Sequence, residues 1–134
     1  MRISIIVFCF IFITSCNSVT NECGRELLCT EEFRSIQVEI VDTDGNALML
    51  DTYQTLQVIG QNLYDFTEDG FFGDQGYYTV LTDAQLNSLQ MDGEVFIFQG
   101  TIDGLEVINE SFTIGHDCCH ISLLSGPERI TLSN

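Results

Sequence analysis

Apolar and polar residues alternate along much of the chain beyond residue 33, as they do in half-buried β-strands. The clearest segment is 34–41, where Ile36, Val38 and Ile40 fall on one face. Turn formers follow at 42–46 and predict a hairpin that returns through 47–50. Further short strands are predicted at 56–59, 63–66, 77–81, 94–102, 105–114, 118–124 and 129–132. About seven to nine short strands predict an all-β fold, an antiparallel β-sandwich with a small barrel as the alternative.

One segment departs from this pattern. Thr82-Asp83-Ala84-Gln85 has the form of a capping box, in which a threonine and a glutamine three residues later satisfy free backbone groups at a helix start. We therefore predict one short helical turn at 83–90.

The first sixteen residues show no alternation at all. Arg2 precedes an apolar run over 5–13, which stops at Thr14-Ser15-Cys16. A basic start, a short apolar stretch and small residues at its end predict a secretory signal peptide. The run is too short for a transmembrane helix, which needs roughly 20 apolar residues.

Ile13-Thr14-Ser15-Cys16 resembles the lipobox of bacterial lipoproteins. The resemblance implies that Cys16 is diacylated on sulfur, that the chain is cut before it, and that its new amino group is acylated. We then expect a signal peptide over 1–15, a lipidated tether and lead-in over 16–28, and a single β-sandwich domain over 29–134. A plain secretory signal with an incidental cysteine is the alternative.

The residues after Cys16 refine the expected location. Asn17-Ser18 lacks the aspartate associated with retention in the inner membrane, so we predict an outer-membrane lipoprotein. Because no acidic run directly follows Cys16, a periplasm-facing orientation is favoured over surface display.

The charge of the chain restricts its partners. Beyond residue 15 it has no lysine and keeps Arg25, Arg34 and Arg129 against 20 acidic residues, a net charge of −17. Such a surface repels phosphate backbones, which argues against nucleic acid as a partner. Membrane attachment must come from acyl chains rather than from a basic patch. A basic partner protein fits this charge, so an acidic inhibitor or immunity-type protein is one alternative function.

Four cysteines remain beyond Cys16, namely Cys23, Cys29, Cys118 and Cys119. In an oxidising compartment an even number suggests two disulfides, and four cysteines allow three connectivities. A bond between adjacent cysteines is strained and incompatible with a regular strand. We therefore predict that the two early cysteines bond to the late pair, with a bond from Cys29 favoured. Local pairing of Cys23 with Cys29, leaving two free thiols, is the alternative.

A metal site is the competing interpretation of the late cysteines. On an extended strand His116, Cys118 and His120 would share one face, and imidazole and thiolate suit zinc or copper. Alternate residues on a strand lie roughly 6–7 Å apart and rarely reach one ion together. We therefore favour disulfides, expect no cofactor, and keep a metal-binding protein or enzyme using these three residues as an alternative.

The acidic, glycine-rich stretch 67–76 is a candidate binding loop. Phe71, Phe72 and Asp74, with Tyr77 just beyond, combine aromatic rings with a carboxylate and could anchor a ligand or a partner. The alternative is that a phenylalanine folds back over one end of the core.

Two segments carry a resemblance to a family. IQVEIVDTDGNAL (36–48) and FTIGHDCCHISLLSGPERITL (112–132) resemble parts of small outer-membrane lipoproteins. Those proteins carry a carboxypeptidase-regulatory-like or transthyretin-like β-sandwich, related in form to immunoglobulin domains. The resemblance implies a fold and a compartment rather than a reaction.

Recognisable catalytic motifs are missing from the sequence. There is no G-x-S-x-G elbow, and without lysine there is no phosphate-binding loop of the Walker type. We expect a lipid-anchored, non-catalytic protein of the cell envelope, a binding or accessory module whose ligand the sequence does not identify. An envelope protein is the partner we expect.

Overall fold

The computed structural model of the chain describes residues 23, 27–69 and 75–133. The elements in these ranges are mostly strands, joined by short turns and two 3₁₀ helices. In chain order they are β1 (Ser35–Asp42), β2 (Thr52–Gln57), β3 (Leu63–Asp65), η1 (Thr67–Asp69), β4 (Tyr77–Thr82), η3 (Asp83–Ser88), β5 (Glu94–Ile102), β6 (Leu105–His116), β7 (Ile121–Ser125) and β8 (Arg129–Leu132).

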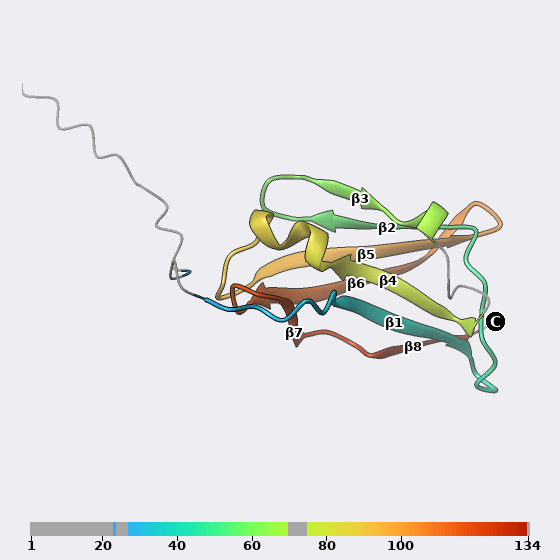
Figure 1. Cartoon of the computed structure of the whole chain (residues 1–134). Helices are drawn as coiled ribbons and strands as arrows, with labels where there is room; N and C mark the ends of the chain where they lie inside the picture. Colours follow the sequence, from blue (N-terminus) through green and yellow to red (C-terminus); the bar gives the residue numbers. More distant parts are fainter. Residues whose placement is uncertain (1–22, 24–26, 70–74, 134) are drawn as a thin grey trace, which may run out of the picture.

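The strands form two facing sheets (Figure 1). The smaller sheet has the order β4-β1-β8 and the larger has the order β3-β2-β5-β6-β7. The predicted all-β sandwich is therefore confirmed. Its pairings are antiparallel except for one, because β8 runs parallel to β1 over Glu39–Asp42.

The predicted return of the first hairpin through 47–50 is wrong. Only a single bridge links Val41 to Ala47, because β4 takes that edge of β1 and the Ile40 N–H donates to the Gly76 carbonyl. The Tyr78 hydroxyl then bonds the irregular segment, donating to the Leu48 carbonyl and accepting from the Leu50 N–H. Burial raises the pKa of Tyr78, and the bond from Leu50 only partly offsets this.

The predicted helical turn is present as η3, which ends two residues earlier than expected. The Thr82 hydroxyl accepts from the Ala84 N–H, and the Gln85 side chain accepts from the Thr82 N–H. This is the capping box that the sequence predicts. Within the described ranges, no helix has the length and apolar character needed to cross a membrane.

The core lies between the sheets and is built from alternate residues of the long strands. Ile36, Val38 and Ile40 of β1 point inward, which confirms the predicted buried face. Fully buried aromatic rings face them from β5 and β6: Phe96, Phe98 and Phe112.

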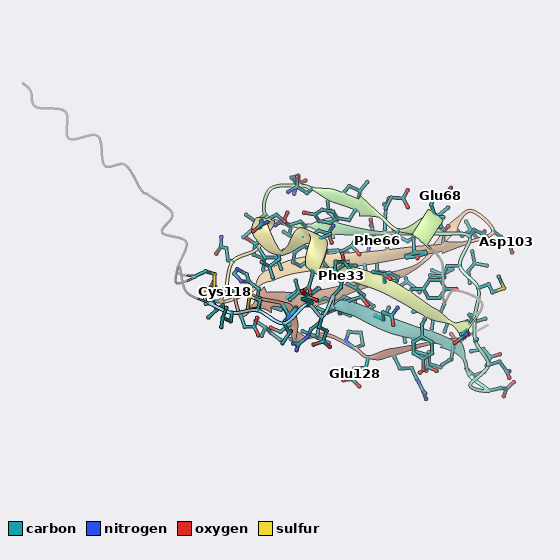
Figure 2. All side chains as sticks on the ribbon, viewed as in Figure 1. Phe33, Phe66, Glu68, Asp103, Cys118 and Glu128 are labelled. Atoms are coloured by element: carbon teal, nitrogen blue, oxygen red, sulfur yellow. A yellow bond between two sulfur atoms is a disulfide. The ribbon has the colours of Figure 1, made fainter. Side chains whose placement is uncertain are left out.

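The two ends of the sandwich lie far apart. We call one the cysteine end; it contains Cys118, the β2–β3 loop (58–62) and η3 (Figures 1 and 2). The opposite end contains Asp103 in the β5–β6 turn and the turn at 42–46. Nine residues of β5 connect the two ends, about 30 Å at a rise of ~3.4 Å per residue.

Candidate functional site at the cysteine end

A tight turn, not a strand, occupies residues 117–120. β6 ends at His116 and β7 begins at Ile121, so the predicted strand over 118–124 is wrong at its start. The Asp117 side chain accepts from the N–H groups of Cys119 (3.0 Å) and His120 (2.8 Å), and these bonds lower its pKa. Cys118 has a φ of 74°, which a strand does not allow.

Two disulfide bonds join this turn to the N-terminal segment. Cys23 is bonded to Cys118 and Cys29 to Cys119, across sequence separations of 95 and 90 residues. The two disulfides predicted from the even cysteine count are therefore present. Both are long-range, so the N-terminal segment is covalently held against the β6–β7 turn.

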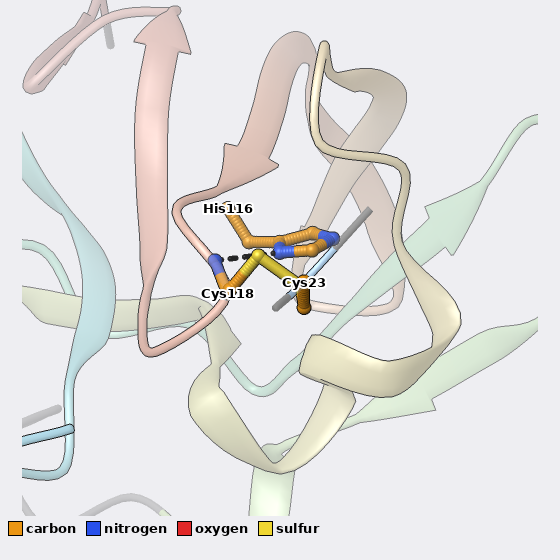
Figure 3. A group of neighbouring side chains, drawn as sticks. All are labelled: Cys23, His116 and Cys118. Carbon is orange, nitrogen blue, oxygen red and sulfur yellow. Dashed lines mark hydrogen bonds between the residues drawn. A yellow bond between two sulfur atoms is a disulfide. The ribbon is translucent and has the colours of Figure 1, made fainter. Parts of the chain in front are cut away.

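His116 lies beside the first disulfide (Figure 3). A ring nitrogen of His116 and the sulfur atoms of Cys23 and Cys118 lie within 4.8 Å of one another. The sulfurs are bonded to each other, however, and metals require thiolates. The His116 nitrogens are also engaged, since Nδ1 accepts from the Cys118 N–H (3.0 Å) and Nε2 lies 3.2 Å from the Leu89 carbonyl. In the disulfide-bonded state this cluster therefore offers no set of free metal ligands.

His120 does not join that cluster, because the turn ends the strand alternation. It is buried, with Nδ1 2.8 Å from Asp83 Oδ2 and Nε2 2.9 Å from the Thr30 hydroxyl. The predicted shared face of His116, Cys118 and His120 is therefore wrong. The structure places only the first two together.

Asp83 is the centre of a polar junction that the sequence did not reveal. Its carboxylate accepts from His120, from the Arg34 N–H (2.8 Å) and from the Ile121 N–H (2.8 Å). Burial raises the pKa of Asp83, but these three hydrogen bonds outweigh it and the net pKa is lowered. In the sequence Asp83 fitted its capping-box position completely, so nothing marked it as the partner of a histidine 37 residues away.

Asp83, His120 and Thr30 repeat the carboxylate–imidazole–hydroxyl order of a hydrolytic triad. Catalysis also needs backbone donors aimed at a developing oxyanion. The N–H groups of Cys119 and His120, in the adjoining turn, both bond to Asp117. Asp83 meanwhile holds the starts of β1 and β7 together. The junction therefore connects the N-terminal segment to β1 and β7.

A second buried polar cluster lies at this end, between β2, β5 and η3. The Gln57 side chain donates to the buried Glu94 carboxylate and to the Ser88 carbonyl, and it accepts from Asn62 and Tyr64. Gln57 is 3% and Glu94 6% exposed. Burying such groups is unfavourable unless they are hydrogen-bonded, so the network fixes how η3 closes this end.

The candidate binding loop is only partly described. Phe71, Phe72 and Asp74 lie outside the described residues. Tyr77, at the start of β4, lines a groove of about 520 Å³ beside the ion pair of Arg129 Nε and Glu39 Oε2 (2.6 Å). The hydrogen bond to Glu39 raises the pKa of Arg129.

A second hollow, of about 500 Å³, lies at the opposite end. It is lined largely by apolar side chains from β5, β6, β8 and the 47–50 segment, among them Leu48, Leu105, Val107 and Leu132. These two hollows are candidate ligand sites in the described chain. The sequence pointed to the first through Tyr77 only, and no sequence motif indicated the second.

Cys16, the predicted lipidation site, lies outside the described residues. Comparison with known proteins finds no matching family model, no matching curated protein and no matching solved structure. The function therefore has to be argued from the chain itself.

Proposed function

We propose that this chain is a lipid-anchored, non-catalytic protein of the cell envelope, in which the β-sandwich is a binding or accessory module. The N-terminal segment supports this, because Ile13-Thr14-Ser15-Cys16 follows a short apolar run and resembles a lipobox. The resemblance to small outer-membrane lipoproteins supports an outer-membrane anchor, and the lack of an acidic run directly after Cys16 favours a domain that faces the periplasm.

The observation that carries the proposal is the pair of disulfides. Such bonds persist in oxidising compartments, which agrees with export. They also hold the N-terminal segment at the sandwich, so Cys23 marks where a short tether ends. This is an arrangement suited to presenting a domain close to a membrane.

The ligand of the module is best sought at the two hollows. The groove beside Tyr77 and Arg129 offers one cation among carboxylates, and the hollow at the opposite end offers apolar side chains. An envelope protein is the partner that we propose. A net charge of −17 beyond residue 15 favours a basic one, and such a complex would weaken at high salt.

Labelling with a radioactive fatty acid tests the anchor. The wild type and Cys9→Ala should incorporate label into the mature protein, because Cys9 lies within the predicted signal peptide. Cys16→Ala should incorporate none. An unlabelled wild type, or label retained in Cys16→Ala, would overturn the proposal.

Elemental analysis of the protein purified from the membrane, with free thiols counted in parallel, tests the non-metal part of the proposal. We expect no stoichiometric transition metal and no free thiol at Cys118. One bound metal ion per chain together with a free Cys118 thiol would instead favour the metal-binding alternative that uses His116, Cys118 and His120.

A further inference from the structure

The cysteine end carries a group of exposed apolar side chains on neighbouring loops and strand ends. Its most exposed members are Leu28 (98%) and Ile59 (61%). We call the group the end patch and define it as Leu28, Val58, Ile59, Met91, Val95 and Leu124.

The members of the end patch come from separate elements that meet at this end. Val58 and Ile59 open the β2–β3 loop, and the Val58 N–H donates to the Val95 carbonyl at the start of β5. Met91 lies in the loop between η3 and β5, with its sulfur 3.8 Å from the sulfur of Cys118. Met91 therefore lies at the point where Cys23 is bonded to the sandwich, and Leu28 precedes Cys29, which is bonded to the adjacent Cys119.

The length of chain before Cys23 limits how far this end can lie from a lipid anchor. Six residues separate Cys16 from Cys23. A fully extended chain spans at most ~3.6 Å per residue, so the tether reaches about 25 Å. This is less than the ~30 Å length of the sandwich. The cysteine end is thus the end held next to the anchoring membrane.

The exposed carboxylates at the two ends also favour the cysteine end as the one next to the membrane. The opposite end presents carboxylates from several turns: Asp42, Asp44, Asp51, Glu68 and Asp103. Among the described residues, the exposed acids near the end patch are Asp92 and Asp117, with Glu31 and Glu32 further along the N-terminal segment. An apolar patch with a few acids suits a zwitterionic lipid surface and is repelled by an anionic one.

We propose that the end patch rests on the surface of the bilayer that holds the lipid anchor, so that the sandwich stands with its opposite end and its apolar hollow directed away from the membrane. This inference depends on the proposed lipidation of Cys16. The occupant of the patch is a lipid surface with zwitterionic headgroups.

The chain has no tryptophan, so a single introduced one reports the depth of its own position. Ile59→Trp places the probe in the end patch, and Leu105→Trp places it on a 69% exposed position at the opposite end. Both positions are open enough to accept an indole. The full-length lipidated proteins are reconstituted into phosphatidylcholine vesicles with brominated acyl chains, which quench tryptophan on contact.

We expect Ile59→Trp to lose most of its fluorescence and Leu105→Trp to lose almost none. Replacing half of the lipid by phosphatidylglycerol should reduce the quenching of Ile59→Trp. Equal quenching at both positions, or stronger quenching at Leu105→Trp, would overturn the inference.

Flotation of the same vesicles separates this inference from the proposed function. If the proteins float with the vesicles but Ile59→Trp is not quenched, the orientation is wrong and the anchor stands. The Cys16→Ala variant should not float. If the wild type does not float either, the proposed lipid anchor is wrong, and the proposed orientation is wrong with it. Near-ultraviolet circular dichroism of each variant shows that the sandwich is folded.

Discussion

At the cysteine end, two disulfides and the Asp83–His120–Thr30 junction connect residues about 90 positions apart in the sequence. At the opposite end the turns are closed by single carboxylates. Asp42 accepts from the N–H groups of Asp44 and Asn46, and Asp51 accepts from the Asp103 N–H. The contacts at the cysteine end hold the N-terminal segment, which belongs to no sheet. The contacts at the opposite end only close turns between strands that are already paired in the sheets. Removing contacts at the two ends should therefore have unequal effects.

The largest effect should follow from loss of both disulfides. In the chain-entropy model, closing a loop of 90 residues stabilises the fold by about 4–5 kcal/mol, with smaller values common in practice. We expect the variant with all four cysteines replaced by serine to lose most of this in urea unfolding. Cys29→Ser/Cys119→Ser and Cys23→Ser/Cys118→Ser should each lose less, because the remaining bond still closes nearly the same loop. An unchanged unfolding free energy in the four-serine variant would show that the N-terminal segment does not contribute to the fold.

The next effect concerns Asp83. Asp83→Asn keeps the shape but removes the charge-assisted hydrogen bonds, at an expected cost of about 1.5–3 kcal/mol. The matched variant Asp42→Asn, at the opposite end, should cost less because its carboxylate is exposed and its bonds are local. Urea midpoints of both variants at neutral pH provide the comparison. A larger loss for Asp42→Asn would reverse the ranking of the two ends.

The pH dependence of stability offers a second measure of the same site. The folded pKa of Asp83 is lowered from 3.8, so its contribution is complete above about pH 4 and is lost as the pH falls through the folded pKa. Asp83→Asn should therefore lose less stability than the wild type between neutral and strongly acidic pH. The Asp83→Asn variant will retain some acid sensitivity from Asp42, Asp65 and Asp117, whose pKa values are also lowered.

The smallest effect should come from the helix cap. Thr82→Ala removes one side of the capping box at the cysteine end and should cost about 1 kcal/mol. Thr43→Ala, on an exposed turn at the opposite end, should stay within about 0.5 kcal/mol of the wild type. Thermal unfolding resolves the two if they are measured side by side. Equal losses would mean that η3 is held by packing and by Gln57 rather than by its cap.

The elements that the sequence predicted well are those with an uninterrupted local pattern. β5 and β8 begin and end where alternation predicts, and the capping box marks η3. The missed return through 47–50 shows the limit of this approach. Its apolar residues suit a strand, but β4 is a competing partner for the same edge of β1, and a sequence does not rank partners.

Of the candidate site, only the two disulfides could be predicted from the sequence. An even number of cysteines indicates disulfides, whereas the turn at 117–120 depends on Asp117 bonding to backbone groups two and three residues on. An aspartate at that offset is a turn signal that could have been used. The pairing of Asp83 with His120 has no such local sign, because it arises only when two distant segments fold together.

The disulfide connectivity also sets an order of events during synthesis. If the chain is exported from its N-terminus, Cys23 and Cys29 reach the oxidising compartment long before Cys118 and Cys119, their partners at separations of 95 and 90 residues. An oxidase that joins cysteines as they emerge would first make the wrong bond, between Cys23 and Cys29. Thiol–disulfide exchange must then resolve it, so the yield of native protein should depend on a disulfide isomerase as well as on an oxidase.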